Sequence, residues 1–185
     1  MSPRLRERPP AAVLIAIALP LLLAGTLAAV AISARLGGFG VPPPPDAGPL
    51  AVVPVEAPAA ADPGCAALLA ALPAELPATD AALPHRPLAA PAPPGVRAWA
   101  ADPRPAVLRC GLPRPAELTP TAALLEVDGV RWLALPAAPD MIAYVAVDRP
   151  VYVALTAPAG AGSGPIQVVS DAIRDTLPAT PVAVR

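Results

Sequence analysis

The sequence contains no lysine and no asparagine, and His85 is the one histidine among its 185 residues. Without lysine there is no Walker-type phosphate-binding loop, because that motif uses a lysine to reach the phosphates. One histidine and two cysteines also leave a metal site short of ligands. We therefore expect neither a metal nor a cofactor. All 13 basic residues are arginines, and together with the abundant alanine and proline this indicates a GC-rich coding sequence, not a function.

The chain also lacks a strong net charge of either sign. Its 13 basic and 14 acidic residues give a net charge of -1. A nearly neutral, slightly acidic chain has no electrostatic attraction for a phosphate backbone. We therefore expect no nucleic-acid partner.

An uncharged apolar stretch covers residues 11–34, directly after arginines at positions 4, 6 and 8. As a helix of about 24 residues it would be about 36 Å long, whereas the hydrocarbon core of a bilayer is about 30 Å thick. Since positive charge stays on the cytoplasmic side, the N-terminus is predicted inside and the rest of the chain outside. We interpret 1–10 as a cytoplasmic tail and 11–34 as a transmembrane helix or signal anchor of a single-pass membrane protein.

A cleaved signal peptide is the alternative for this stretch. Such peptides have an apolar core of about 7–15 residues and a small-x-small cleavage site. Ala29-Val30-Ala31 supplies such a site, although the apolar run is long for a signal peptide. In either case the downstream chain leaves the cytoplasm, anchored or secreted.

Residues 35–62 are rich in proline, with four in a row at 42–45. This composition favours extended conformers, so we predict a semi-rigid linker that lifts the next domain off the bilayer. A docking site for a proline-binding module is the alternative interpretation. Residues 63–185 are then the extracytoplasmic domain.

The two cysteines, Cys65 and Cys110, are most simply one disulfide in an exported chain. Free thiols or metal ligands are the alternatives. A bond that closes a loop of about 45 residues would stabilise the domain by up to about 4 kcal/mol.

The domain is predicted to be α+β, a small antiparallel sheet with flanking helices. Asp62-Pro63 is a good helix start, an N-cap followed by proline, and apolar residues at helical spacing continue to Pro73. From Pro73 to Pro105 prolines recur so often that we predict a long ordered loop, anchored in the core by Trp99. A last helix is predicted from Pro165 to Leu177, with Ile166, Val169, Ile173 and Leu177 on one stripe.

Strands are predicted at 106–110, 143–147 and 151–155, the last two joined by a turn at Asp148-Arg149-Pro150. The clearest signal is Asp128-Gly129 between 124–127 and 130–133, which is typical of a hairpin with a two-residue type I′ turn. This register pairs Glu126 with Arg131 on the wetter face. We expect Leu125, Val127, Val130 and Trp132 on the core face.

Three short motifs resemble a known family: Arg109-Cys110-Gly111, Gly129-Val130-x-Trp132 and the run from Asp148 to Val153. They occur in this order after an N-terminal anchor. In this respect the chain resembles an actinobacterial family of small exported proteins, the domain-of-unknown-function family numbered thirty-five fifteen. One departure is Ala100, where members often have glycine after the tryptophan. The resemblance implies a mycobacterial-type envelope location and no particular activity.

No residues form a recognisable catalytic constellation. His85 is flanked by Pro84 and Arg86, and a general base needs an orienting partner and a nucleophile in reach. Ser163 lies in the glycine-rich run 160–164, which is not a G-x-S-x-G nucleophile motif. That run could hold an anion at the start of the following helix, but it lacks the third glycine of a dinucleotide loop. We interpret His85 as a surface residue and 160–164 as a flexible connector.

Asp148 and Arg149 are a possible polar recognition pair. Adjacent residues in a strand point to opposite faces, so we do not expect them to form an ion pair. Arg149 is expected to bond backbone or a surface carboxylate, and Arg109, next to Cys110, to behave similarly.

Two functions remain. The first is a non-catalytic envelope module, structural or partner-binding, and the scarcity of His, Ser, Lys and Asn favours it. The second is an extracytoplasmic hydrolase whose site assembles only in three dimensions.

Overall fold

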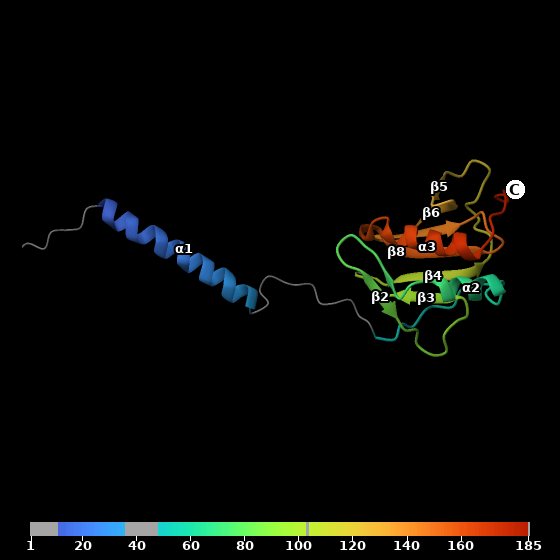
Figure 1. Cartoon of the computed structure of the whole chain (residues 1–185), viewed down its shortest axis with the longest axis horizontal. Helices are drawn as coiled ribbons and strands as arrows, with labels where there is room; N and C mark the ends of the chain where they lie inside the picture. Colours follow the sequence, from blue (N-terminus) through green and yellow to red (C-terminus); the bar gives the residue numbers. More distant parts are fainter. Residues whose placement is uncertain (1–10, 36–47, 103, 185) are drawn as a thin grey trace, which may run out of the picture. The chain divides into compact units, whose positions relative to one another are not determined.

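The computed structural model describes residues 11–35, 48–102 and 104–184, and within the first helix it describes the side chains of 19–32. The chain divides into two compact units, Met1–Pro44 and Pro45–Arg185. The first contains helix α1, Ala11–Arg35 (Figure 1). Over the part of the chain that the structure describes, no helix combines the length and apolarity that a membrane crossing requires. The predicted tail 1–10 and linker residues 36–47 lie outside the described residues.

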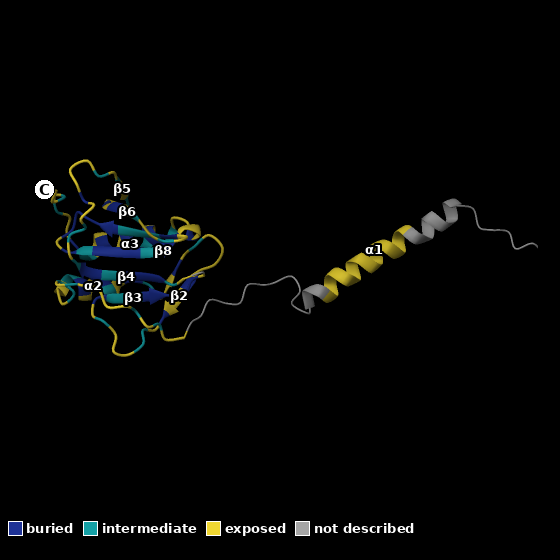
Figure 2. Ribbon diagram, turned by 180° about the vertical axis from the view of Figure 1, so that it is seen from behind, coloured by how far each residue is buried: buried dark blue, intermediate teal, exposed yellow. Residues whose placement is uncertain are grey.

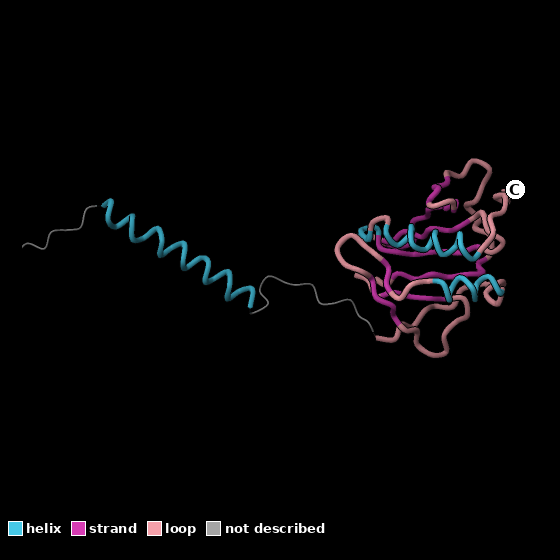
Figure 3. Tube along the Cα trace, in the orientation of Figure 1, coloured by secondary structure: helices cyan, strands magenta, loops and turns pink. Residues whose placement is uncertain are grey.

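The second unit is an eight-stranded sheet with the order β1-β2-β3-β4-β8-β7-β6-β5. Every neighbouring pair is antiparallel. Helices α2 and α3 pack across one face of this sheet (Figures 1 and 3). The predicted combination of an antiparallel sheet, flanking helices and one disulfide is confirmed. The elements are α2 (Pro63–Ala71), β1 (Glu75–Leu76), β2 (Leu83–Arg86), β3 (Val96–Trp99), β4 (Ala106–Leu112), β5 (Leu124–Val127), β6 (Val130–Ala138), β7 (Met141–Ala146), β8 (Tyr152–Pro158), a 3-10 turn (Ala159–Ala161) and α3 (Gly164–Thr176).

The main core lies between the sheet and the two helices. It contains both tryptophans, Trp99 and Trp132, with Leu68 from α2 and Val169 and Ile173 from α3. A second, smaller cluster covers the opposite face, where strands β4 and β8 are mostly buried in the view from behind (Figure 2). Its buried members are Leu118, Leu133, Val145, Val147 and Ala154.

Both domain helices begin close to where the sequence predicts. The Asp62 carboxylate accepts a hydrogen bond of 2.7 Å from the Gly64 backbone N–H, as an N-cap should. Helix α3 starts one residue before Pro165, and its predicted apolar stripe is buried. Ile166, Val169, Ile173 and Leu177 are all at most 5% exposed.

The prediction of a long loop between Pro73 and Pro105 is wrong, because the segment contains β1, β2 and β3. Proline removes one backbone donor, which an antiparallel sheet tolerates near its edge. Pro84 lies in β2, near that edge, and its carbonyl still accepts a bond of 2.8 Å from Ala100. Trp99 is fully buried, and its predicted role as a core anchor is confirmed.

The hairpin of β5 and β6 has the predicted register, with Glu126 opposite Arg131 and Val127 opposite Val130. Asp128 and Gly129 both have positive φ, 48° and 77°. Val130 and Trp132 are fully buried as expected. Leu125 does not join the core, being 47% exposed, because β5 is the edge strand and has a neighbour on one side only.

The second half of the predicted linker is not a free spacer. Residues 48–62, here called the strap, lie along the domain and hydrogen-bond to it. Leu50 pairs with the β2–β3 connection, donating to the Pro87 carbonyl at 2.8 Å and accepting from Ala89 at 2.9 Å. Further along, the Ala59 N–H donates to the Gly111 carbonyl at 3.0 Å. An extended proline-rich chain can make such bonds through its non-proline residues, so composition alone placed the domain boundary too late.

Gly111 lets the strap approach β4 closely. It sits at a register irregularity between Cys110 and Leu112, with φ at +86°. A Cβ atom there would overlap the backbone of Ala59 and Ala60. Strand β4 ends at Leu112, two residues beyond the predicted end at Cys110.

Gly111→Ala should therefore destabilise the domain clearly more than Gly129→Ala. Both glycines have positive φ, which costs an alanine about 1–2 kcal/mol. A Cβ on Gly129 meets no atom within 4 Å, so only the backbone penalty applies there. Urea unfolding of the whole chain, followed by tryptophan fluorescence, measures both losses. Equal losses would mean that the strap does not pack on Gly111.

Candidate functional site

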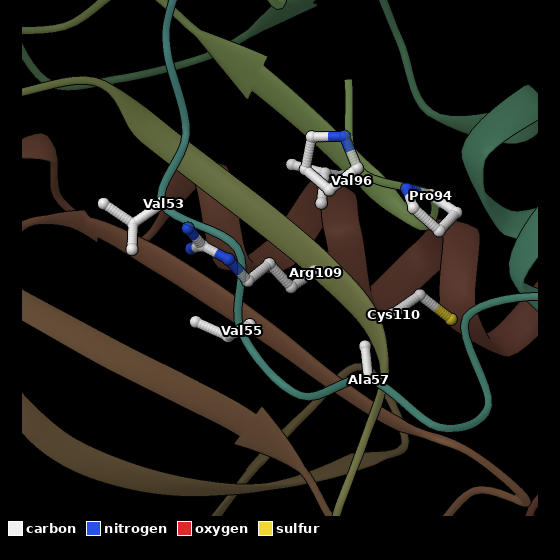
Figure 4. Close-up of a pocket in the computed structure, with 8 residues that line it drawn as sticks. Val53, Val55, Ala57, Pro94, Val96, Arg109 and Cys110 are labelled. Carbon is white, nitrogen blue, oxygen red and sulfur yellow. The ribbon is translucent and has the colours of Figure 1, made fainter. Parts of the chain in front are cut away.

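A small pocket of about 100 Å³ lies between the strap and the sheet (Figure 4). Arg109 of β4 projects into it from the face opposite the helices, since its neighbours Leu108 and Cys110 point into the main core. The walls are otherwise almost entirely apolar. The lining residues are Val53, Val55, Ala57, Pro93, Pro94, Val96, Arg109 and Cys110.

The Arg109 guanidinium has no protein partner in this pocket. Its Nε atom is buried and has no hydrogen-bond partner among the described residues. Burial lowers the pKa of Arg109 from its usual value, through desolvation alone. The Nε atom of Arg97 is buried without a partner as well, but Arg97 donates from Nη1 to the Leu69 carbonyl at 2.8 Å. Arg109 is thus a partly buried cation, and the donors that it can offer to a ligand are those of its Nη groups.

The strap leaves apolar side chains exposed around this arginine. Val53 is 75% exposed and Val55 is 50% exposed. Pro94 is exposed on the opposite side of the pocket mouth. We call Val53, Val55, Pro93, Pro94 and Arg109 the Arg109 patch.

The side chains with potential for acid–base or nucleophilic chemistry lie elsewhere. His85 is exposed and belongs to β2, where it pairs with Trp99, and is not in the predicted loop. Ser163 is exposed at the start of α3 and makes no side-chain capping bond. Neither residue lines the Arg109 pocket. In the ranges 11–35, 48–102 and 104–184, no group of three or more His, Cys, Asp or Glu residues is placed to hold a metal ion.

Asp148 and Arg149 do form an ion pair, contrary to the sequence prediction. The Arg149 Nη1 and Asp148 Oδ2 atoms are 3.5 Å apart, and both side chains are buried. The pair is possible because these residues lie in a bend between β7 and β8, where strand alternation does not apply. Arg149 also donates to the Gly129 carbonyl at 2.7 Å, so the predicted backbone bond is confirmed. The pair braces this bend against the hairpin turn.

The disulfide joins Cys65 of α2 to Cys110 of β4, with a Cα–Cα distance of 5.6 Å. It fixes the helix layer to the strand that carries Arg109. One side of β4 is therefore covalently tied, and the opposite side presents the pocket.

A protein-family model matches residues 15–182, which is most of the chain. The chain belongs to this family, described as Protein of unknown function (DUF3515). Comparison with curated proteins and with solved structures found no significant match.

The motifs that resemble the DUF3515 family each have a structural role in this chain. In the first, Arg109 enters the pocket, Cys110 forms the disulfide and Gly111 admits the strap. The other two motifs meet where Arg149 binds the Gly129 carbonyl. The sequence predicts that Arg109 bonds backbone or a surface carboxylate, and the described residues show no such bond. Its setting was missed because nothing local indicates that the strap returns to β4.

Proposed function

We propose that this DUF3515 protein is a membrane-anchored, non-catalytic module of the cell envelope that binds a protein partner on its extracytoplasmic domain. The observation that carries the proposal is the Arg109 patch, an arginine without an internal partner among exposed apolar side chains. Arginine is enriched in the cores of protein interfaces, where water is excluded. A bound partner would cover the exposed apolar side chains of this patch and could pair with its arginine.

Anchoring is supported by the sequence of residues 11–34. The helix has 25 residues, and no charged residue interrupts it before Arg35. A helix that is apolar on all sides needs lipid or protein around it. The arginines at 4, 6 and 8 favour a cytoplasmic N-terminus.

A non-catalytic role is supported by the composition of the pocket. Its walls are valine, proline, alanine and the disulfide-bonded Cys110, with Arg109 as the charged group. An arginine stays protonated at ordinary pH, which suits it to binding an anion and not to proton transfer.

Reporter fusions after Arg185 test the proposed topology. A reporter active only after export should be active there, and a reporter active only in the cytoplasm should be inactive. The matched control is the same fusion without residues 11–34, which should lose the exported signal. Alkaline carbonate should leave the protein in the membrane. An active cytoplasmic reporter at this position would overturn the proposal, and a soluble, shortened exported form would replace the anchor by a cleaved signal peptide.

A further inference from the structure

We infer that the Arg109 patch is a receptor for an acidic peptide segment, whose carboxylate pairs with Arg109 while its apolar neighbours cover Val53 and Val55. The inference rests on the proposed function and names the chemistry of the partner. It follows from three properties of the site: an unsatisfied cation, a small volume and an apolar rim.

The position of the cation is fixed by the sheet. Arg109 lies in a strand with neighbours on both sides, pairing with Val96 of β3 and Ala154 of β8, so its backbone is fixed. Figure 4 shows its guanidinium extending between Val53 and Val55 of the strap. A carboxylate there would accept charge-assisted hydrogen bonds, which are about twice as strong as neutral ones.

The volume of the pocket limits what can enter it. Pockets for whole cofactors or drug-sized molecules hold about 300–1,000 Å³. At about 100 Å³ this pocket admits a group the size of a carboxylate with its adjoining methylene groups. The rest of the ligand must lie outside, over the exposed valines. An acidic side chain flanked by apolar residues has this shape.

The walls disfavour a phosphate or sulfate group. Sites for those anions usually gather several backbone N–H groups. Here Pro93 and Pro94 have no N–H to donate, and the other wall side chains apart from Arg109 are apolar. One planar guanidinium matches the two oxygens of a carboxylate better than the tetrahedral oxygens of phosphate.

The test is NMR titration of the purified whole chain in detergent micelles. The signals are the Arg109 Nε–Hε pair and the methyl groups of Val53 and Val55. The probes are the capped peptide Ac-Val-Glu-Val-NH2, its partner Ac-Val-Gln-Val-NH2, the free acid Ac-Val-Gln-Val-OH and inorganic phosphate. We expect the Glu peptide to shift all three signals saturably. The capped Gln peptide should bind at least about tenfold more weakly, because it lacks the charged hydrogen-bond partner of Arg109. Saturable binding of the free acid would show that a chain terminus can supply the carboxylate.

Arg109→Gln should weaken binding of the Glu peptide by a similar factor, whereas Arg131→Gln should leave that binding unchanged. Arg131 is the matched control because it is an exposed arginine whose carboxylate partner is Glu126. If Arg109→Gln does not fold, the comparison of Glu and Gln peptides on the wild-type chain still decides. Equal binding of those two peptides, no saturable shift, or tighter binding of phosphate would overturn the inference. If export is confirmed while no peptide binds, the inference fails and the anchored topology stands; if the reporters contradict export, the proposed function fails on its own account.

Discussion

Replacing Trp132 by alanine is expected to lower the free energy of unfolding by about 3–5 kcal/mol. The side chain is fully buried in the main core, between the sheet and α3. Its indole N–H also donates to the Ser170 hydroxyl at 3.0 Å, and that hydroxyl in turn donates to the Ile166 carbonyl at 2.7 Å. The substitution therefore removes a large apolar volume and the bond that ties the hairpin to α3. Such a loss is a large fraction of the stability of a small domain.

Urea unfolding of the whole chain measures this effect, with the fluorescence of the remaining Trp99 as the signal. Both tryptophans belong to the unit from Pro45 onward, so the α1 segment does not contribute. The control is Glu126→Ala in the same hairpin. Its ion pair with Arg131 spans 3.7 Å between side chains that are more than half exposed, and should contribute at most about 1 kcal/mol. Equal losses for the two variants would mean that the faces of the hairpin are reversed.

Removing the disulfide is expected to cost up to about 4 kcal/mol, the chain-entropy value for a loop of this length. The bond closes 45 residues of chain that include β1, β2 and β3. These strands are short and their connections are rich in proline, so fewer backbone bonds hold them than hold the central strands. The double variant Cys65→Ala/Cys110→Ala avoids leaving a free thiol.

The matched control for this prediction is the wild-type chain with and without a reducing agent. Reduction should lower the urea midpoint of the wild type towards that of the double variant and leave the double variant unchanged. A reducing agent that shifts neither protein, or shifts both equally, would contradict a stabilising bond between these cysteines.

The parts of the fold that could be predicted are those encoded in consecutive residues. Asp128-Gly129 sets the register of the hairpin because both turn residues need positive φ. Asp62-Pro63 marks the start of α2 through an N-cap bond two residues away. The stripe on α3 follows from helical spacing.

The missed features depend on contacts between distant segments. The strap is held by Gly111, about fifty residues further along the chain, and no local pattern announces that contact. The strands between Pro73 and Pro105 are short, and the prolines in the connections around them made the segment look like a loop. Asp148 and Arg149 pair because they lie in a bend, and Leu125 is exposed because β5 is an edge. The Arg109 pocket combines the strap, the β2–β3 connection and β4, so it could be recognised only in three dimensions.

The central proposal, a disulfide-braced domain held outside the cytoplasm by residues 11–34, is tested most directly by intact-mass spectrometry. The protein would be extracted from carbonate-washed membranes of its own host in the presence of an alkylating agent. We predict a membrane-bound chain that still contains residues 11–34, with both cysteines oxidised and neither alkylated. A chain that begins near residue 32 and is found outside the membrane, or one that carries two alkyl groups, would contradict it.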